Sequence, residues 1–200
     1  NAGTLNSTMY ANGDTIIAGW KSNAKITKSI DGGTTWTNST LYANVSKNIV
    51  QLNGNFYLRT DGGIHKSTDG CSTFTTLAGV PSNLEEGALT VSNGVLVCGG
   101  IGDSSIYISH DEGTTWTETA TTQEPYCLEV LNGVLYQGTR DRKVFRSTDN
   151  GATWTNLTGT GINSDGVKSF AIFNGFLYAS TTNVLYRTSD FNSVKEESIP

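Results

Sequence analysis

The segment Ser29-Ile30-Asp31-Gly32-Gly33-Thr34-Thr35-Trp36 returns three times along the chain with small changes, at residues 67–74, 109–116 and 147–154. We call these four segments the aspartate loops. A degenerate fifth copy at residues 188–192 keeps the hydroxyl group and the aspartate but lacks the glycine and the tryptophan. Intervals of 38, 42, 38 and 41 residues separate the repeated aspartates, which are Asp31, Asp69, Asp111, Asp149 and Asp190. A period of about 40 residues indicates a repeat architecture.

A second periodic signal runs in phase with the first. The dipeptide Asn-Gly occurs once in each period, between two apolar runs, at residues 12–13, 53–54, 93–94, 132–133 and 174–175. Asn-Gly tolerates the positive φ angles of a type I′ turn and is a strong hairpin signal. Each period therefore predicts four strands. Two flank Asn-Gly, the third enters the aspartate loop and the fourth leaves it, as in residues 4–11, 14–20, 24–30 and 35–40.

One four-stranded sheet cannot bury both of its faces, but several sheets packed around a common axis can. The sequence therefore predicts an all-β, five-bladed β-propeller with four antiparallel strands in each blade and an aspartate loop between the third and fourth strands. The 200 residues form one domain, with blades at approximately 1–43, 44–84, 85–123, 124–164 and 165–200. We expect the first strand of each blade to lie nearest the axis, and blade 1 to close the ring by packing on blade 5.

Composition narrows the classes of partner. The net charge of −5 argues against nucleic acid, whose phosphates need a basic surface. No segment is apolar for long enough to predict membrane insertion. Cys71, Cys98 and Cys127 have no metal-like spacing, so we expect neither a metal nor another cofactor. The chain starts at Asn1, and we expect either a trimmed mature protein or a part of a larger polypeptide or assembly.

The residue types of the aspartate loop predict a structural role. An aspartate can accept backbone N–H groups of a tight turn, and glycine adopts backbone angles that a side chain opposes. We expect the aromatic residue that follows to pack between blades, which applies to Trp36, Phe74, Trp116 and Trp154. One carboxylate in each blade is too isolated for paired acid–base catalysis or for a calcium site.

The four good copies resemble Asp-boxes, also called BNR repeats, of sialidases, other glycoside hydrolases, sortilin-type receptors and photosystem II assembly factors. The resemblance spans the whole chain as a repeat. It implies that each loop stabilises the fold, on the face opposite the one that binds ligand.

Ligand-binding residues are therefore expected on the opposite face, in loops that differ from blade to blade. Trp20 either stacks on a sugar ring or caps the adjacent blade, and the arginines either bind an anionic group or pair with neighbouring aspartates. Glu129 is an unusual carboxylate near the axis that either pairs with a lysine such as Lys47 or Lys168 or meets channel water. The predicted site residues are Trp20, Arg59, Asp61, Tyr126, Arg140, Asp141 and Arg142.

These features favour a non-catalytic recognition module over an enzyme. We expect it to be extracellular or surface-exposed, as a secreted or virion-associated protein, and to bind a glycan or a surface protein. The alternative is a sialidase-like glycoside hydrolase, which would need three arginines around the substrate. Arg59, Arg140 and Arg187 are available, but the chain lacks the Phe/Tyr-Arg-Ile-Pro segment with which sialidases open. Asp61 and Asp141 are the one carboxylate pair suited to another glycoside hydrolase.

Overall fold

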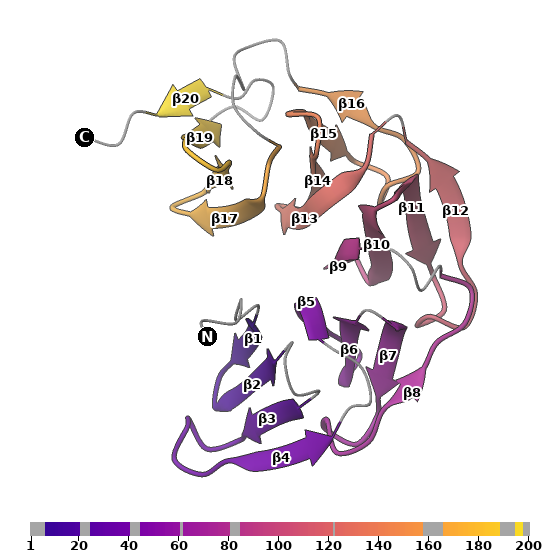
Figure 1. Cartoon of the computed structure of the whole chain (residues 1–200), viewed down its shortest axis with the longest axis vertical. Helices are drawn as coiled ribbons and strands as arrows, with labels where there is room; N and C mark the ends of the chain where they lie inside the picture. The colour runs from indigo at the N-terminus through magenta and orange to yellow at the C-terminus, as the bar shows by residue number, and fades with distance from the viewer. Residues whose placement is uncertain are drawn as a thin grey trace, which may run out of the picture.

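The chain forms five sheets of four antiparallel strands, arranged around a common axis as a β-propeller in the computed structural model (Figure 1). The structure describes residues 7–20, 25–40, 45–60, 62–80, 85–121, 123–157, 166–188 and 195–197. These residues contain no helix, and hence none that could span a membrane. The predicted fold class is confirmed.

Each blade contains four consecutive strands in sequence order. Blade 1 consists of β1 (Ser7–Asn12), β2 (Thr15–Trp20), β3 (Lys25–Ser29) and β4 (Thr37–Thr40). Blade 2 consists of β5 (Val45–Leu52), β6 (Asn55–Thr60), β7 (Gly63–Ser67) and β8 (Thr75–Thr76). Blade 3 consists of β9 (Glu85–Ser92), β10 (Val95–Ile101), β11 (Asp103–Ser109) and β12 (Thr117–Ala120). Blade 4 consists of β13 (Pro125–Leu131), β14 (Val134–Thr139), β15 (Val144–Ser147) and β16 (Thr155–Asn156). Blade 5 consists of β17 (Ser169–Phe173), β18 (Phe176–Ser180), β19 (Leu185–Thr188) and β20 (Lys195–Glu197).

The Asn-Gly pairs form the first hairpin turn of blades 2 to 5. Their asparagines have positive φ angles of 50°, 46°, 51° and 49°, at Asn53, Asn93, Asn132 and Asn174. The expected turn at residues 12–13 of blade 1 is wrong by one residue. Asn12 pairs with Thr15, so the turn is Gly13-Asp14. The Asp14 carbonyl accepts a hydrogen bond from the Gly32 N–H (3.0 Å), which ties the shifted turn to the aspartate loop.

The shift reverses the faces of β1, because neighbouring residues of a strand point to opposite sides. Tyr10 therefore faces blade 2. Its ring packs edge-on against Phe56, with centroids 5.5 Å apart, and its hydroxyl donates to Gln51 (2.8 Å). Met9 points away from blade 2 and is exposed.

The hydrophobic core lies between the blades. Four clusters connect blade 1 to 2, 2 to 3, 3 to 4 and 4 to 5, and each combines buried side chains of two neighbouring sheets. The inner strands β1, β5, β9, β13 and β17 contact one another in that order. Burying a large apolar side chain contributes about 1.5–3 kcal/mol, so these interfaces dominate the stability of the fold.

The blades form an open arc. Figure 1 shows blade 1 (indigo) and blade 5 (orange to yellow) at the two sides of an opening. In the part of the chain that the structure describes, β1 and β17 make at most marginal contact. The expectation that blade 1 packs on blade 5 is therefore wrong for these residues.

Candidate functional site

The aspartate loops use their carboxylates internally. Asp111 accepts the backbone N–H and the hydroxyl of Thr115 (2.8 and 2.7 Å) and the hydroxyl of Ser109 (2.9 Å). Ser109 Oγ in turn accepts the N–H of Gly113 (2.7 Å). The same pattern holds in the other three aspartate loops, around Asp31, Asp69 and Asp149. Asp190 lies outside the described residues.

These hydrogen bonds stabilise the ionised carboxylates and so lower the pKa values of the loop aspartates. The donors from Thr35, followed by that from Ser29, lower the pKa of Asp31 to about 2. The backbone and side chain of Thr115 lower the pKa of Asp111 to about 2. A carboxylate held in this way stays ionised and occupied by its own loop, which suits a scaffold role.

The aromatic residues of three aspartate loops pack against the preceding blade. Phe74, Trp116 and Trp154 join the clusters between blades 1 and 2, 2 and 3, and 3 and 4. Trp36 of blade 1 has no preceding blade and is 46% exposed. Its indole N–H donates to the Gly33 carbonyl (2.9 Å), as that of Trp116 does to its own loop.

Three of the predicted site residues come together on the opposite face. Arg140 follows β14, and its guanidinium donates to Glu124, with Nη1 and Oε2 3.2 Å apart. Asp141 is the next residue, and Tyr126 lies at the start of β13. Lys168, just before β17, places its Nζ 4.2 Å from the centroid of the Tyr126 ring. Glu124 and Asp141 also contribute to a raised pKa of Arg140, with Glu124 the main cause.

Two cavities flank this cluster. One of about 440 Å³ is lined by Ser104, Gln123, Glu124, Arg140 and Asp141. The other, of about 240 Å³, lies between the inner strands and is lined by Asn48, Ser169, Phe170, Lys168 and residues 126–129. We call the combined set the loop-face site, which comprises Ser104, Gln123, Glu124, Tyr126, Arg140, Asp141 and Lys168.

Glu129 lines the smaller cavity. Burial raises the pKa of this carboxyl, which accepts the backbone N–H of Val130 (3.0 Å). No cation among the described side chains opposes that rise. Lys168, one of the two expected partners, binds the Tyr126 ring instead, and the side chain of Lys47 lies outside the described residues.

The other predicted residues are not part of the loop-face site. Arg59 is fully buried in β6, on the face that it shares with Ile64 in the core between blades 2 and 3. Burial raises the pKa of the Cys98 thiol to about 12, and the positive charge of Arg59 offsets part of this rise. Arg142 is an exposed loop residue with a φ angle of 66°. Asp61 and the side chain of Trp20 lie outside the described residues.

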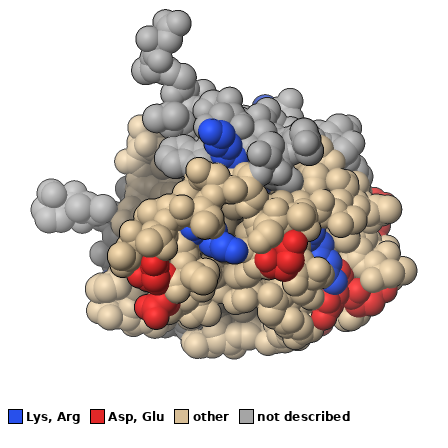
Figure 2. Space-filling view, turned by 90° about the horizontal axis from the view of Figure 1, so that it is seen from below, with Lys and Arg blue, Asp and Glu red and all other residues tan. Residues whose placement is uncertain are grey.

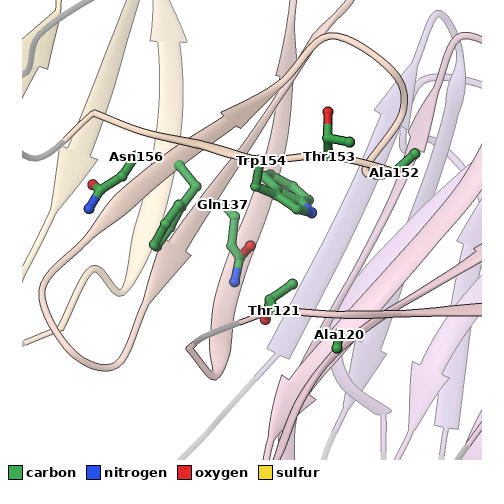
Figure 3. A pocket seen from close by; sticks show the side chains of 8 residues that line it. Ala120, Thr121, Gln137, Ala152, Thr153, Trp154 and Asn156 are labelled. Atoms are coloured by element: carbon green, nitrogen blue, oxygen red, sulfur yellow. The ribbon is translucent and has the colours of Figure 1, made fainter.

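A further groove lies between blades 3 and 4, and the sequence did not predict it. Figure 3 shows Gln137 of β14 extending into the space between Trp154 and Thr121. The groove has a volume of about 310 Å³ and is lined by Ala120, Thr121, Gln137, Phe145, Ala152, Thr153, Trp154 and Asn156. Gln137 is buried, and its Oε1 and the Trp154 Nε1 have no hydrogen-bond partner among the described residues.

Two positions, one that lines the groove and one next to its lining, differ from their counterparts in several other blades. Eight residues after the loop aspartate, blades 2 and 4 have Leu77 and Leu157, which fill their interfaces with the next blade. Blade 3 has the smaller, polar Thr119 at this position, and blade 1 has Ser39. Five residues after the turn asparagine, Gln137 replaces the apolar residues of blades 2, 3 and 5, which are Leu58, Cys98 and Ala179. Aligning the repeats on both signals would have revealed this pair of changes.

Charges are dispersed over the side of the molecule seen in Figure 2. Acidic and basic side chains are interspersed there among uncharged residues, and the described part of this side shows no continuous basic patch. This distribution agrees with the acidic net charge of the chain.

No protein-family model and no curated protein matches this sequence. Solved structures share its fold. YCF48 bound to D1 peptide is 17% identical, with a TM-score of 0.72 over 96% of this chain and 66% of that chain. An ancestral GH74 enzyme is 17% identical, with a TM-score of 0.75 over 94% of this chain and 30% of that chain. The computationally designed Ika8 protein is 14% identical, with a TM-score of 0.67 over 96% and 60%.

At these identities the likeness shows the fold alone. The chain also spans less than two thirds of the length of each of these structures. What the neighbours bind or catalyse is therefore a property of those proteins.

Proposed function

We propose that this chain is a non-catalytic recognition module that binds a peptide segment of a protein partner at the loop-face site. The observation that carries the proposal is the Arg140–Glu124 ion pair, which lines one cavity, together with the Lys168–Tyr126 contact, which lines a second. Both lie on the face that the aspartate loops leave free. The site offers cationic donors and carboxylate acceptors within a short stretch of surface, which suits the charged and amide groups of a peptide.

The ion pair is easy to exchange for a ligand. The Arg140 side chain is 58% exposed, and an exposed ion pair contributes only about 0–1 kcal/mol to stability. A peptide carboxylate can therefore take the place of Glu124 at the guanidinium with little cost to the fold. Arg140 can bind such a group through two parallel hydrogen bonds.

The aromatic group of the site favours a peptide over a sugar. Sugar stacking needs a free ring face, whereas Tyr126 is only 8% exposed and Lys168 lies over its ring. The structural neighbour YCF48, which is described with a bound D1 peptide, supports the same choice by analogy of fold.

The described residues give little support to a sialidase-like reaction. Such an enzyme needs three arginines that converge on one substrate carboxylate. Arg59 is buried between blades, Arg140 pairs with Glu124, and Arg187 lies over the Phe176 ring of blade 5, 4.8 Å from its centroid. The three therefore lie in three different environments.

The experiment that tests the proposal is a screen of short immobilised peptides, run beside fluorogenic glycosides. Arg140→Ala and Lys168→Ala should each weaken binding of the selected peptides about tenfold or more, since each removes a charged contact. Arg142→Ala is the matched control, because this exposed arginine lines neither cavity, and it should leave affinity unchanged. Binding that is insensitive to both test variants, or turnover of a glycoside, would overturn the proposal.

A neutral glycan is the second candidate ligand, and the groove between blades 3 and 4 favours it. The aromatic rings of Trp154 and Phe145 lie beside the amides of Gln137 and Asn156. A sugar hydroxyl can donate to Gln137 Oε1 and another can accept from Trp154 Nε1, which satisfies two buried polar atoms. The volume of about 310 Å³ is at the lower end for ligand pockets and suits a single sugar ring.

Gln137→Leu tests this second candidate on a glycan array. Leucine occupies the equivalent position of blade 2, so the variant should fold while glycan binding is lost and peptide binding at the loop-face site is kept. Glycan binding that persists in Gln137→Leu would exclude the groove as the sugar site.

A further inference from the structure

The arc ends in two sheet faces that have no blade against them. The N-terminal end face belongs to blade 1 and includes Met9, Ile16 and Trp36. The C-terminal end face belongs to blade 5 and includes Phe173 and Tyr178. We propose that these end faces are docking surfaces for further four-stranded blades of the same repeat, stacked in continuation of the arc.

Met9 shows the unpaired character of the N-terminal end face. Once the one-residue turn shift is included, its position corresponds to residues that face the preceding blade and are buried in blades 2 to 5. Met9 itself is 71% exposed. The buried counterparts are Ile49, Leu89, Leu128 and Phe170.

Trp36 and its aspartate loop also lack a preceding blade to pack against. A side chain added at Gly113 would meet Leu77 of the preceding blade, and one at Gly151 would meet Ile106 and Ile108 of the preceding blade. At Gly33 the nearest side chains are those of its own blade, Trp36 and Ile16. The aspartate loop of blade 1 is therefore built like the others but lacks the blade on which the others pack.

The C-terminal end face exposes residues whose counterparts in the other blades are buried against the following blade. Phe173, the residue before the hairpin turn, is 63% exposed, whereas its counterparts Leu52, Ser92 and Leu131 are buried against the following blade. Tyr178 is half-buried, and its counterparts are fully buried at Tyr57, Val97 and Tyr136. An exposed apolar surface of this kind on a stable module marks an interaction site.

The four interfaces inside the arc indicate what would bind the two end faces. Each internal interface joins a face of the blade 1 kind to a face of the blade 5 kind. A further blade of the same repeat carries both kinds and fits either end. The structural neighbours YCF48 and Ika8 agree with this, because the chain covers only 66% and 60% of their lengths while 96% of it is matched.

A second copy of the chain fits less well. Its end faces are also complementary, in a head-to-tail manner that would lead to rings or open filaments. Figure 1, however, shows the five blades occupying most of the circle, so the opening is smaller than the arc itself. A second five-bladed arc cannot enter it, whereas a smaller number of blades can.

The test extends the full chain after residue 200 with copies of its own blades 3 and 4, residues 85–164, as one-blade and two-blade versions. Hydroxyl-radical footprinting then measures the oxidation of Met9, Trp36 and Phe173. We expect at least one extended version to be monomeric, with oxidation of Phe173 reduced severalfold, and ring closure to reduce that of Met9 and Trp36 as well.

Variants separate docking from unspecific effects. Phe173→Asp in the extended chain should restore the oxidation of the remaining end-face residues. Ile30→Asp is the matched control, since this exposed isoleucine stands where the other blades have the exposed Thr68, His110 and Thr148. Folded extensions that leave all three residues as reactive as before would overturn the proposal, as would an unextended chain whose end faces are already protected by self-association.

Discussion

At one end of the blades, Asp111 receives three hydrogen bonds from Ser109 and Thr115 of its own loop. At the opposite end, Glu124 pairs with an exposed arginine beside open cavities. Among the residues that the structure describes, the first arrangement recurs in four aspartate loops, and the second occurs once. The difference separates carboxylates that hold the scaffold from those that are free to exchange partners. Substitutions in the aspartate loops should therefore change the stability of the fold, whereas substitutions in the loop-face site should change ligand affinity.

The largest expected effect is on the stability of an aspartate loop. Gly113→Ala places a Cβ 2.4 Å from Leu77 at a φ angle of 88°. Backbone strain of about 1–2 kcal/mol and overpacking of about 1–3 kcal/mol should lower the free energy of unfolding by about 3 kcal/mol. Chemical denaturation checks this value. Gly94→Ala is the matched control, because its φ angle is also positive, 80°, but nothing lies within 4 Å of the added Cβ. It should cost about 1–2 kcal/mol, and equal losses in the two variants would show that the packing against blade 2 is unimportant.

Removal of the buried hydroxyl should have the next largest effect. Ser109→Ala leaves the Gly113 N–H without its acceptor and Asp111 without one donor. A buried donor left unpaired costs about 1–3 kcal/mol, which denaturation of the variant should reproduce. The exposed Thr117→Ala substitution in β12 should change the stability by less than about 0.5 kcal/mol. A similar loss in both variants would argue against the loop network.

Acidic pH should reduce the stability that the aspartate loops contribute to the fold. The folded pKa of Asp31 and Asp111 is about 2, below the value of about 3.9 for an unfolded chain. A depressed folded pKa contributes stability that is present above pH 4 and is lost as the pH falls toward 2. Melting temperatures should therefore fall in this window, and Asp111→Asn should reduce the slope. An unchanged slope would mean that the hydrogen bonds do not favour the ionised form.

The raised pKa of Glu129 should have the opposite effect on how stability changes with pH. Burial disfavours its ionised form, so this carboxyl destabilises the folded chain above its unfolded pKa and stops doing so as it becomes protonated. Glu129→Gln should therefore raise the melting temperature at pH 7 and have little effect at pH 4. A variant that melts lower at pH 7 would indicate a favourable partner for the carboxylate in solution.

The fold could be predicted to a large extent because its signals repeat. Asn53-Gly54 and its copies predicted four turns, and the aspartate loops predicted the second hairpin of each blade at the same end of the sheets. Blade 1 differed because Asn12-Gly13-Asp14 contains two dipeptides that suit a tight hairpin, Asn-Gly and Gly-Asp. The sequence did not favour one of them, and the hydrogen bond from Gly32 to Asp14 depends on tertiary structure.

The residues of the loop-face site could be predicted only where their position in a loop was enough to place them at that end of the blade. Tyr126, Arg140 and Asp141 meet because every second connection of an antiparallel blade lies at the same end of the sheet. Arg59 was misplaced because it lies within a strand, where the alternation of side chains turns it into the core. The open arc was also not predicted, since each blade appears complete by itself and the exposure of its end faces depends on the number of blades present.

The smallest expected effect on stability belongs to the loop-face end, and it also gives the most direct test of the proposed function. Arg140→Ala breaks an exposed ion pair and should change the free energy of unfolding by less than about 1 kcal/mol. The measurement is the affinity of this variant for a selected peptide, taken together with its stability. Recognition at the loop-face site predicts affinity reduced about tenfold or more with stability retained. Unchanged affinity, or a loss of stability as large as that of Ser109→Ala, would contradict it.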